Sequence, residues 1–365
     1  MAKVKIQGHA SGTGILTVTA PNTSTDRTIT LPDATGTLLN SDGDGSSLTG
    51  INDVTVATTA PGSPSEGDLW FNSDTSTVSD IETKTLASWN GTFWKSLTAG
   101  AITATGGLVT THGNYKVHTF LSSADFVVSS AGQVDVLIVA GGGAGGNWHA
   151  GGGGAGGMQY PSVSVTPQTY SIVVGAGGAG GTSSVGSNGG NSSALGTTSL
   201  GGGRGGNYTS TAAASGGSGG GGNGYTPSSL NIGAAGTSGQ GNAGGNGQDS
   251  HAGGGGGGKA AVGTNASNSS TAGGGGNGEN NDYRTGSNIT YAGGGGGGVW
   301  SGTKGDGGTG GGGDGSYNAN VTPPTPGEAN TGGGGGGAGS QGGTTSYAAE
   351  TTGGSGIVVI RYALS

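Results

Sequence analysis

Residues 134–157 read VDVLIVAGGGAGGNWHAGGGGAGG, and the fold of the larger part of the chain follows from them. The uninterrupted apolar run 136–139 predicts a strand that is buried on both faces. The glycines after it disfavour α-helix, since each costs about 1 kcal/mol relative to alanine. An extended threefold helix makes no internal hydrogen bonds, so neighbouring segments without side chains must pair its backbone groups laterally. The sequence therefore predicts a bundle of polyglycine II helices that starts from a β-sheet.

The same two patterns recur up to the end of the sequence. Glycine runs occupy 253–258, 293–298 and 332–337, and the apolar run 357–360 predicts a second buried strand. We predict that 136–139 and 357–360 lie in one sheet, which makes the glycine region an insertion between two strands. The expected fold class is all-β with essentially no α-helix, in which small N-terminal β-modules precede a β-sandwich that frames a bundle of polyglycine II helices. Further strands are predicted at 107–110, 115–120, 125–128 and 170–175.

Composition excludes several classes of protein. With 95 Gly and 10 Pro among 365 residues the chain resembles low-complexity sequence, but only 8% of residues are charged, and strand-like apolar clusters recur, so we reject disorder. A net charge of −8 with eleven Lys and Arg argues against nucleic acid or an anionic membrane as partner. The absence of cysteine excludes disulfides and thiolate chemistry. No apolar stretch is long enough for a membrane helix, so membrane insertion is not expected.

The N-terminal region predicts short strands at 14–19, 27–31 and 36–39. Such strands bury their apolar faces only against copies of themselves, which favours a fibrous homo-oligomer. We assign 1–40 to an N-terminal β-module and 41–60 to a connector. Within 41–60 an acidic stretch has the spacing of a calcium loop, but it lacks the required glycine and the bidentate glutamate, so a plain acidic turn is favoured. The positions concerned are Asp42, Asp44, Ser46, Ser47 and Asp53.

Residues 61–98 predict a second small module. A strand is expected at 67–72, and Asn90-Gly91 favours a tight hairpin over 89–94 because glycine accepts positive φ angles. Three of the five tryptophans are Trp70, Trp89 and Trp94. They could stack on sugar rings at the surface, but in so small a module they more often form the core, which is the interpretation that we favour.

Three parts of the chain resemble bacteriophage tail-fibre proteins. Residues 14–39, from GILTVTAPN to RTITLPDATGTLL, and the motifs PSEGDLWFN (64–72) and WNGTFW (89–94) resemble small modules of such fibres. Residues 105–365 resemble the glycine-rich adhesin domains at fibre tips, best known from T-even-like phages. The resemblance implies a virion protein that binds a host surface receptor, either a glycan or an outer-membrane protein, during adsorption. It also implies a homotrimer that attaches to other tail proteins through its N-terminal modules.

In such adhesins the loops between glycine helices contact the host. The matching positions here are turns that carry aromatic or basic side chains, although any of them could simply cover the bundle. The candidate receptor-binding residues are Trp148, His149, Tyr208, Tyr225, Tyr283, Arg284, Trp300 and Tyr317.

Catalytic motifs are not convincing. The glycines 253–258 followed by Lys259 approach a phosphate-binding loop, but Ala260 replaces the Ser or Thr that would hold Mg²⁺. The five histidines show no metal-ligand spacing, and no carboxylate pair can be assigned from the sequence. We therefore expect a protein that is not an enzyme and that has no cofactor or metal. Two alternatives to the adhesin remain, a purely structural fibre that decorates the capsid or tail and a polysaccharide-degrading tail spike.

Overall fold

The computed structural model describes residues 54–97, apart from 80 and 82, and residues 102–364, apart from 182–184, 209–210, 226–230, 250, 318–321 and 340–350. All of the described residues belong to one unit, 54–365. The predicted N-terminal β-module 1–40 and the acidic stretch with calcium-loop spacing lie outside the described residues. The described residues form strands and no helix, which confirms the all-β prediction, and none of them therefore belongs to a helix that could cross a membrane.

Residues 54–97 form a small sheet in the order β1-β2-β3-β4. The predicted hairpin is confirmed, since Trp89 lies opposite Trp94 and Gly91 has a φ of +91°. The parallel pair β1–β2 extends the sheet into the predicted connector 41–60. The strands are β1 (Val54–Ala57), β2 (Leu69–Asn72), β3 (Leu86–Trp89) and β4 (Trp94–Ser96).

The tryptophans of this sheet form its core. Trp70 is fully buried, Trp94 is buried against it with ring centroids 5.5 Å apart, and Trp89 packs on Trp94 at 5.6 Å. The indole of Trp70 donates a hydrogen bond to the Ala57 carbonyl at 3.1 Å. Trp70 and Trp94 therefore stabilise the module from inside, and Trp89 packs against them with part of its side chain exposed.

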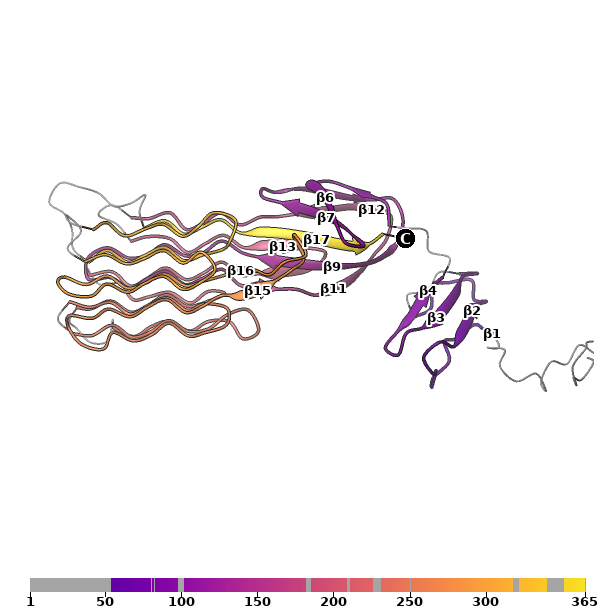
Figure 1. The fold of residues 1–365 in the computed structure, drawn as a ribbon, viewed down its shortest axis with the longest axis horizontal. Coiled ribbons are helices and arrows are strands. Elements are labelled where there is room, and N and C mark those ends of the chain that lie inside the picture. Colours follow the sequence, from indigo (N-terminus) through magenta and orange to yellow (C-terminus); the bar gives the residue numbers. More distant parts are fainter. Residues whose placement is uncertain are drawn as a thin grey trace, which may run out of the picture. The chain divides into compact units, whose positions relative to one another are not determined.

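The larger part of the chain begins with a six-stranded sheet, in which β9 and β17 lie side by side at the centre (Figure 1). Ile357 pairs with Val139 and Ile360 with Val136, which confirms that the two apolar runs lie in one sheet. Both strands are long and apolar because they are buried on both faces. The strands of the path are β10 (Met158–Gln159), β9 (Gly132–Val139), β17 (Ile357–Ala363), β7 (Tyr115–Phe120) and β6 (Leu108–His112), and β11 (Ser162–Val165) also pairs with β9.

A three-stranded sheet in the order β12-β8-β5 packs on one face of the six-stranded sheet and completes a sandwich. Phe126 from the smaller sheet and Phe120 from the larger one meet in the shared core with centroids 6.3 Å apart. The strands are β5 (Ala104–Thr105), β8 (Ala124–Val128) and β12 (Gln168–Ile172). Two short hairpins lie at the same end of the glycine region, β13 (Ser192–Ala194) with β14 (Thr197–Ser199) and β15 (Glu279–Asn281) with β16 (Ile289–Tyr291).

Between β9 and β17 the chain runs back and forth in extended glycine segments, which we call the glycine bundle (Figure 1). Hydrogen bonding in the bundle has a period of three residues, as a threefold helix requires. In segment 150–157 every third amide donates to the same neighbouring segment. Amides 151 and 154 donate to carbonyls 206 and 203, amides 152 and 155 to carbonyls 254 and 257, and amides 153 and 156 to carbonyls 335 and 332.

The carbonyls of segment 150–157 are paired in the same way by three further segments. Amides 143 and 146 donate to carbonyls 154 and 151, amides 218 and 221 to carbonyls 155 and 152, and amides 295 and 298 to carbonyls 153 and 150. The segment is thus surrounded on all sides, and its backbone groups are satisfied without water. Such close approach leaves no room for a side chain, since a Cβ on Gly152 would lie 2.0 Å from the Gly295 carbonyl oxygen.

Candidate binding site

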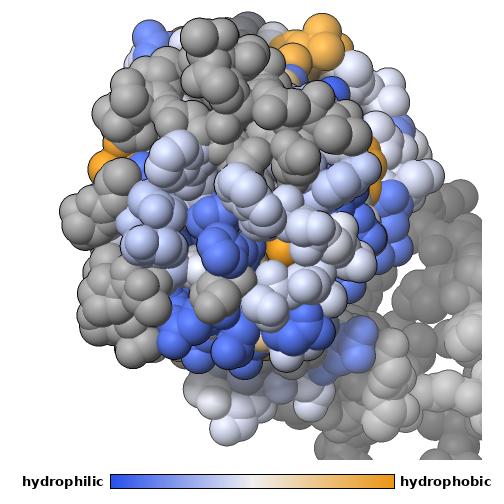
Figure 2. Space-filling view, turned by 90° about the vertical axis from the view of Figure 1, so that its left-hand side faces the viewer, coloured by the Kyte–Doolittle hydropathy of each residue, from blue (hydrophilic) through white to orange (hydrophobic). Residues whose placement is uncertain are grey.

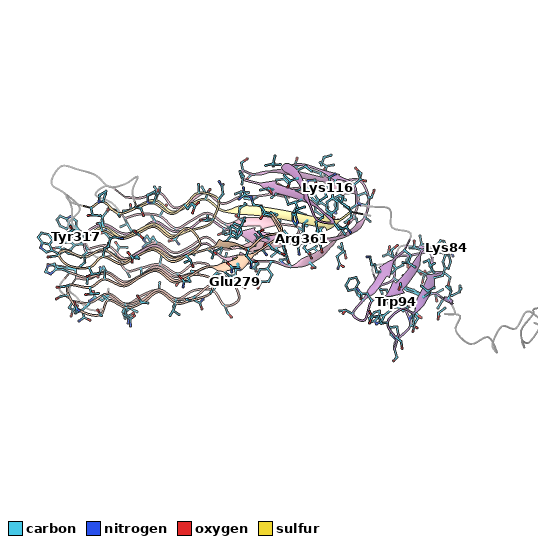
Figure 3. All side chains as sticks on the ribbon, viewed as in Figure 1. Lys84, Trp94, Lys116, Glu279, Tyr317 and Arg361 are labelled. Atoms are coloured by element: carbon cyan, nitrogen blue, oxygen red, sulfur yellow. The ribbon has the colours of Figure 1, made fainter. Side chains whose placement is uncertain are left out.

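The bundle has two ends, and the sheets occupy one of them. Segment 140–146 runs away from β9 and segment 150–157 returns to β10, so the turn 147–149 between them lies at the opposite end, which we call the far end. The same alternation places the turns around Tyr208, Tyr225, His251 and Trp300 there. Tyr317 is labelled at the far end in Figure 3.

Six rings from five of these turns touch one another and form what we call the aromatic cluster. His149 lies at its centre, with ring centroids 4.5 Å from His251, 5.5 Å from Trp300 and 5.6 Å from Tyr208. Tyr208 continues the contacts to Trp148 at 4.7 Å and to Tyr225 at 4.0 Å. Turns that are far apart in the sequence therefore present one continuous group of rings. The aromatic cluster comprises Trp148, His149, Tyr208, Tyr225, His251 and Trp300.

Backbone hydrogen bonds hold these turns in register. The Gly224 amide donates to the His149 carbonyl at 2.7 Å, the His251 amide to Gly224 at 2.6 Å, and the Trp300 amide to His251 at 3.0 Å. Trp148, His149 and His251 have positive φ angles of 62°, 42° and 101°. Residues with side chains rarely adopt this conformation, and where they do the strain often serves a functional site.

The aromatic cluster is partly buried and partly open to solvent. His149 is only 4% exposed, whereas Trp300 is 56% exposed. Trp148 Nε1 and His149 Nδ1 are buried, and neither has a hydrogen-bond partner among the described residues. Buried polar atoms without a partner are rare in folded proteins, and a bound water, ion or ligand group is one way in which they become paired.

Burial lowers the pKa of His149 to about 4, and the adjacent His251 adds to the effect. In the unfolded chain a histidine titrates near 6.5, so between about pH 6.5 and 4 the unfolded state binds more protons. The free energy of unfolding should therefore decrease as the pH is lowered from about 6.5 to about 4, by up to about 1.4 kcal/mol per pH unit. Denaturation of the wild type and of His149→Gln at about pH 7 and about pH 4.5 tests this. Equal pH dependence in the two proteins would show that His149 does not titrate as described.

Tyr317 lies at the far end but belongs to another group of residues. Its ring packs on a small apolar cluster that includes Ala252 and Val299, and its backbone bridges to Val299. It therefore covers the edge of the bundle beside the aromatic cluster, with no ring contact to it in the described part of the chain.

Tyr283 and Arg284 lie at the opposite end of the bundle, in the turn between β15 and β16 (Figure 1). The Arg361 guanidinium of β17 lies over the Tyr283 ring at 3.8 Å and pairs with Asp282 at 3.2 Å and with Asp135 at 3.3 Å. Burial raises the pKa of Tyr291, and the neighbouring Arg284 partly offsets this. These contacts join the hairpin to the sheet, so the two candidates lie apart from the other six.

A pocket of about 250 Å³ adjoins the aromatic cluster at the far end. It shares the turn 248–252 with His251, and the Gly247 amide donates to the Asn231 carbonyl across it at 2.7 Å. Inside it the Asn231 amide donates to Asp249 Oδ1. We call it the Asn–Asp pocket, and it is lined by Asn231, Ile232, Asn246, Gly247, Gln248 and Asp249.

Sequence reasoning missed His251 and the Asn–Asp pocket. The spacing of the histidines fits no metal site and gives no other signal, and Asn, Gln and Asp are ordinary turn residues with no signal of their own. The described part of the end face is largely hydrophilic, with few apolar patches (Figure 2).

Lys259, which follows the glycine run that resembles a phosphate loop, lies at the strand end of the bundle. Its ammonium group donates to the Gly239 carbonyl at 2.8 Å and lies 3.8 Å from Glu279. These partners occupy the Lys259 side chain, and the glycine run before it crosses the bundle as an extended segment, so it does not form a phosphate-binding loop.

In the described ranges no three His, Asp or Glu side chains come together as metal ligands.

A family described as "Glycine-rich domain" matches residues 119–363, which is most of the chain. No curated protein matches the chain. The match begins in β7 and ends in β17, so it spans the whole glycine bundle and the two central strands that enclose it.

Proposed function

Because the chain belongs to the glycine-rich domain family, we propose that its bundle is a rigid scaffold for a receptor-binding surface, in a bacteriophage tail fibre that binds the host cell during adsorption. In this proposal residues 1–98 connect the protein to the virion and the far end of the bundle faces the host. The fibre works by binding alone, without catalysis or a cofactor.

One observation carries the proposal. Five of the eight side chains that were singled out from the sequence lie in one aromatic cluster, although they come from turns between residues 148 and 300. Residues that only cover a bundle need not meet in one place. Tryptophan and tyrosine are the residues that most often dominate binding energy at protein interfaces, and Trp300 is exposed enough to be reached.

Purified full-length protein should block adsorption of the phage that carries it, and Trp300→Ala should weaken this competition at least about 10-fold because it removes the exposed ring of the cluster. The matched control is Val262→Ala, since Val262 is equally exposed but lies at the strand end. Arg284→Ala, also at that end, should have little effect.

If wild-type protein at saturating concentration leaves adsorption unchanged, the receptor-binding proposal is wrong and a purely structural fibre is favoured. Release of reducing sugar from host polysaccharide would favour the tail-spike alternative instead.

A further inference from the structure

The Asn–Asp pocket is rich in hydrogen-bond acceptors. The Asp249 carboxylate is half-buried, and one of its oxygens accepts from the Asn231 amide. Asn231 is 6% exposed, and its own Oδ1 is buried without a partner in the part of the chain that the structure describes. The Asn246 side-chain oxygen accepts a hydrogen bond from the Gly233 amide at 2.9 Å, which holds the Asn246 side chain in place at one side of the pocket. The Asn246 and Gln248 carboxamides of the lining add N–H donors, so a ligand that matches this pocket carries hydrogen-bond donors for Asp249 together with acceptors.

Charge narrows the ligand class further. None of the residues that line the pocket is Lys or Arg, while Asp249 contributes a negative charge. Phosphate, sulfate or a sugar acid would meet a carboxylate with no cation to offset it, which disfavours anions. Hydroxyl groups donate to carboxylate and carboxamide oxygens without this penalty.

The pocket also has an apolar side and an aromatic neighbour. Ile232 is 61% exposed at its rim. His251 follows Asp249 on the same turn and contacts Trp300 with ring centroids 6.0 Å apart. A pyranose ring has hydroxyls at its edge and an apolar face of C–H groups, so it can use the acceptors and pack on these side chains at once.

Size fits a single sugar ring. The pocket is an open depression of about 250 Å³, somewhat smaller than the roughly 300–1,000 Å³ of pockets that enclose drug-sized ligands. The described part of the end face is largely hydrophilic (Figure 2), unlike the apolar core of a protein interface. We infer that the far end binds a neutral saccharide, with one ring in the Asn–Asp pocket and the next residue of the glycan against Trp300. This inference rests on the proposed function and names the chemical class of the receptor.

The test applies purified full-length protein to an array of neutral, amino-sugar and acidic oligosaccharides, followed by calorimetric titration with the neutral glycan that binds best. We expect binding to neutral glycans and none to acidic ones. Asp249→Asn keeps the shape of the side chain and removes its charge, so it should weaken binding at least about 10-fold. Thermal denaturation of the variant checks that the fold is kept.

The matched control is Gln159→Ala, in a groove at the strand end of the bundle, which should leave binding unchanged. Preference for acidic glycans, or equal affinity of Asp249→Asn and wild type, overturns the inference. If the protein blocks adsorption but binds no array glycan, the receptor-binding proposal stands and the saccharide inference fails. If it neither blocks adsorption nor binds a glycan, both are wrong.

Discussion

A chain that ends at Gly356 is expected to yield no soluble protein. The deletion removes β17, which pairs with β9 on one side and with β7 on the other. Ile357, Val358, Val359 and Ile360 are fully buried and Tyr362 is 2% exposed. Burial of each such side chain contributes about 1.5–3 kcal/mol, so the loss is on the order of 10 kcal/mol. That equals the whole stability of a typical domain.

The measurement is soluble yield, with circular dichroism of whatever remains in solution. A chain that ends at Ala363 keeps the whole strand and serves as the control, which should be soluble. A soluble protein with unchanged spectrum after removal of β17 would mean that the bundle does not depend on the strand that closes its sheet.

Gly152→Ala should destabilise the bundle by about 3 kcal/mol or more, at the upper end of the cost of one inserted methyl group. The new Cβ would lie 2.0 Å from the Gly295 carbonyl oxygen and 2.5 Å from its carbon. Backbone atoms cannot rotate away as a side chain can, so two segments must separate and their hydrogen bonds break. Denaturant unfolding of the purified variant measures the effect.

Gly274→Ala is the matched control within the same bundle. A Cβ there meets nothing closer than 3.5 Å, and the segment is extended in the same way. Alanine also restricts the unfolded chain, so this variant should be neutral or more stable by up to about 1 kcal/mol. Equal losses of stability in the two variants would contradict close lateral packing as the reason for glycine.

The framework of the fold could be predicted from the sequence because it depends on local signals. The apolar runs 136–139 and 357–360 identify two central strands, and Asn90-Gly91 identifies a hairpin. The hairpins β13–β14 and β15–β16 were missed, since their three-residue strands, such as Glu279–Asn281, have weak strand propensity and form through contacts with neighbouring segments. The order of segments in the bundle is not predictable, because glycine runs resemble one another and have no side chains to select a neighbour.

The candidate site was predictable in part for the same reason. Aromatic residues in turns between glycine runs, such as Trp148 and Trp300, could be identified locally. Which end of the bundle a turn occupies depends on how many times the chain has crossed, so Tyr283 and Arg284 could not be separated from the others. Polar turn residues such as Asp249 gain meaning only when distant turns are placed side by side.

Hydrogen–deuterium exchange of the purified protein tests most directly whether the glycine segments are laterally bonded and rigid. The account predicts that the amides of 151–157 and 253–257 exchange orders of magnitude more slowly than an unstructured peptide, because each donates to a neighbouring segment. Exchange of these amides at the unstructured rate, while β17 remains protected, would contradict it.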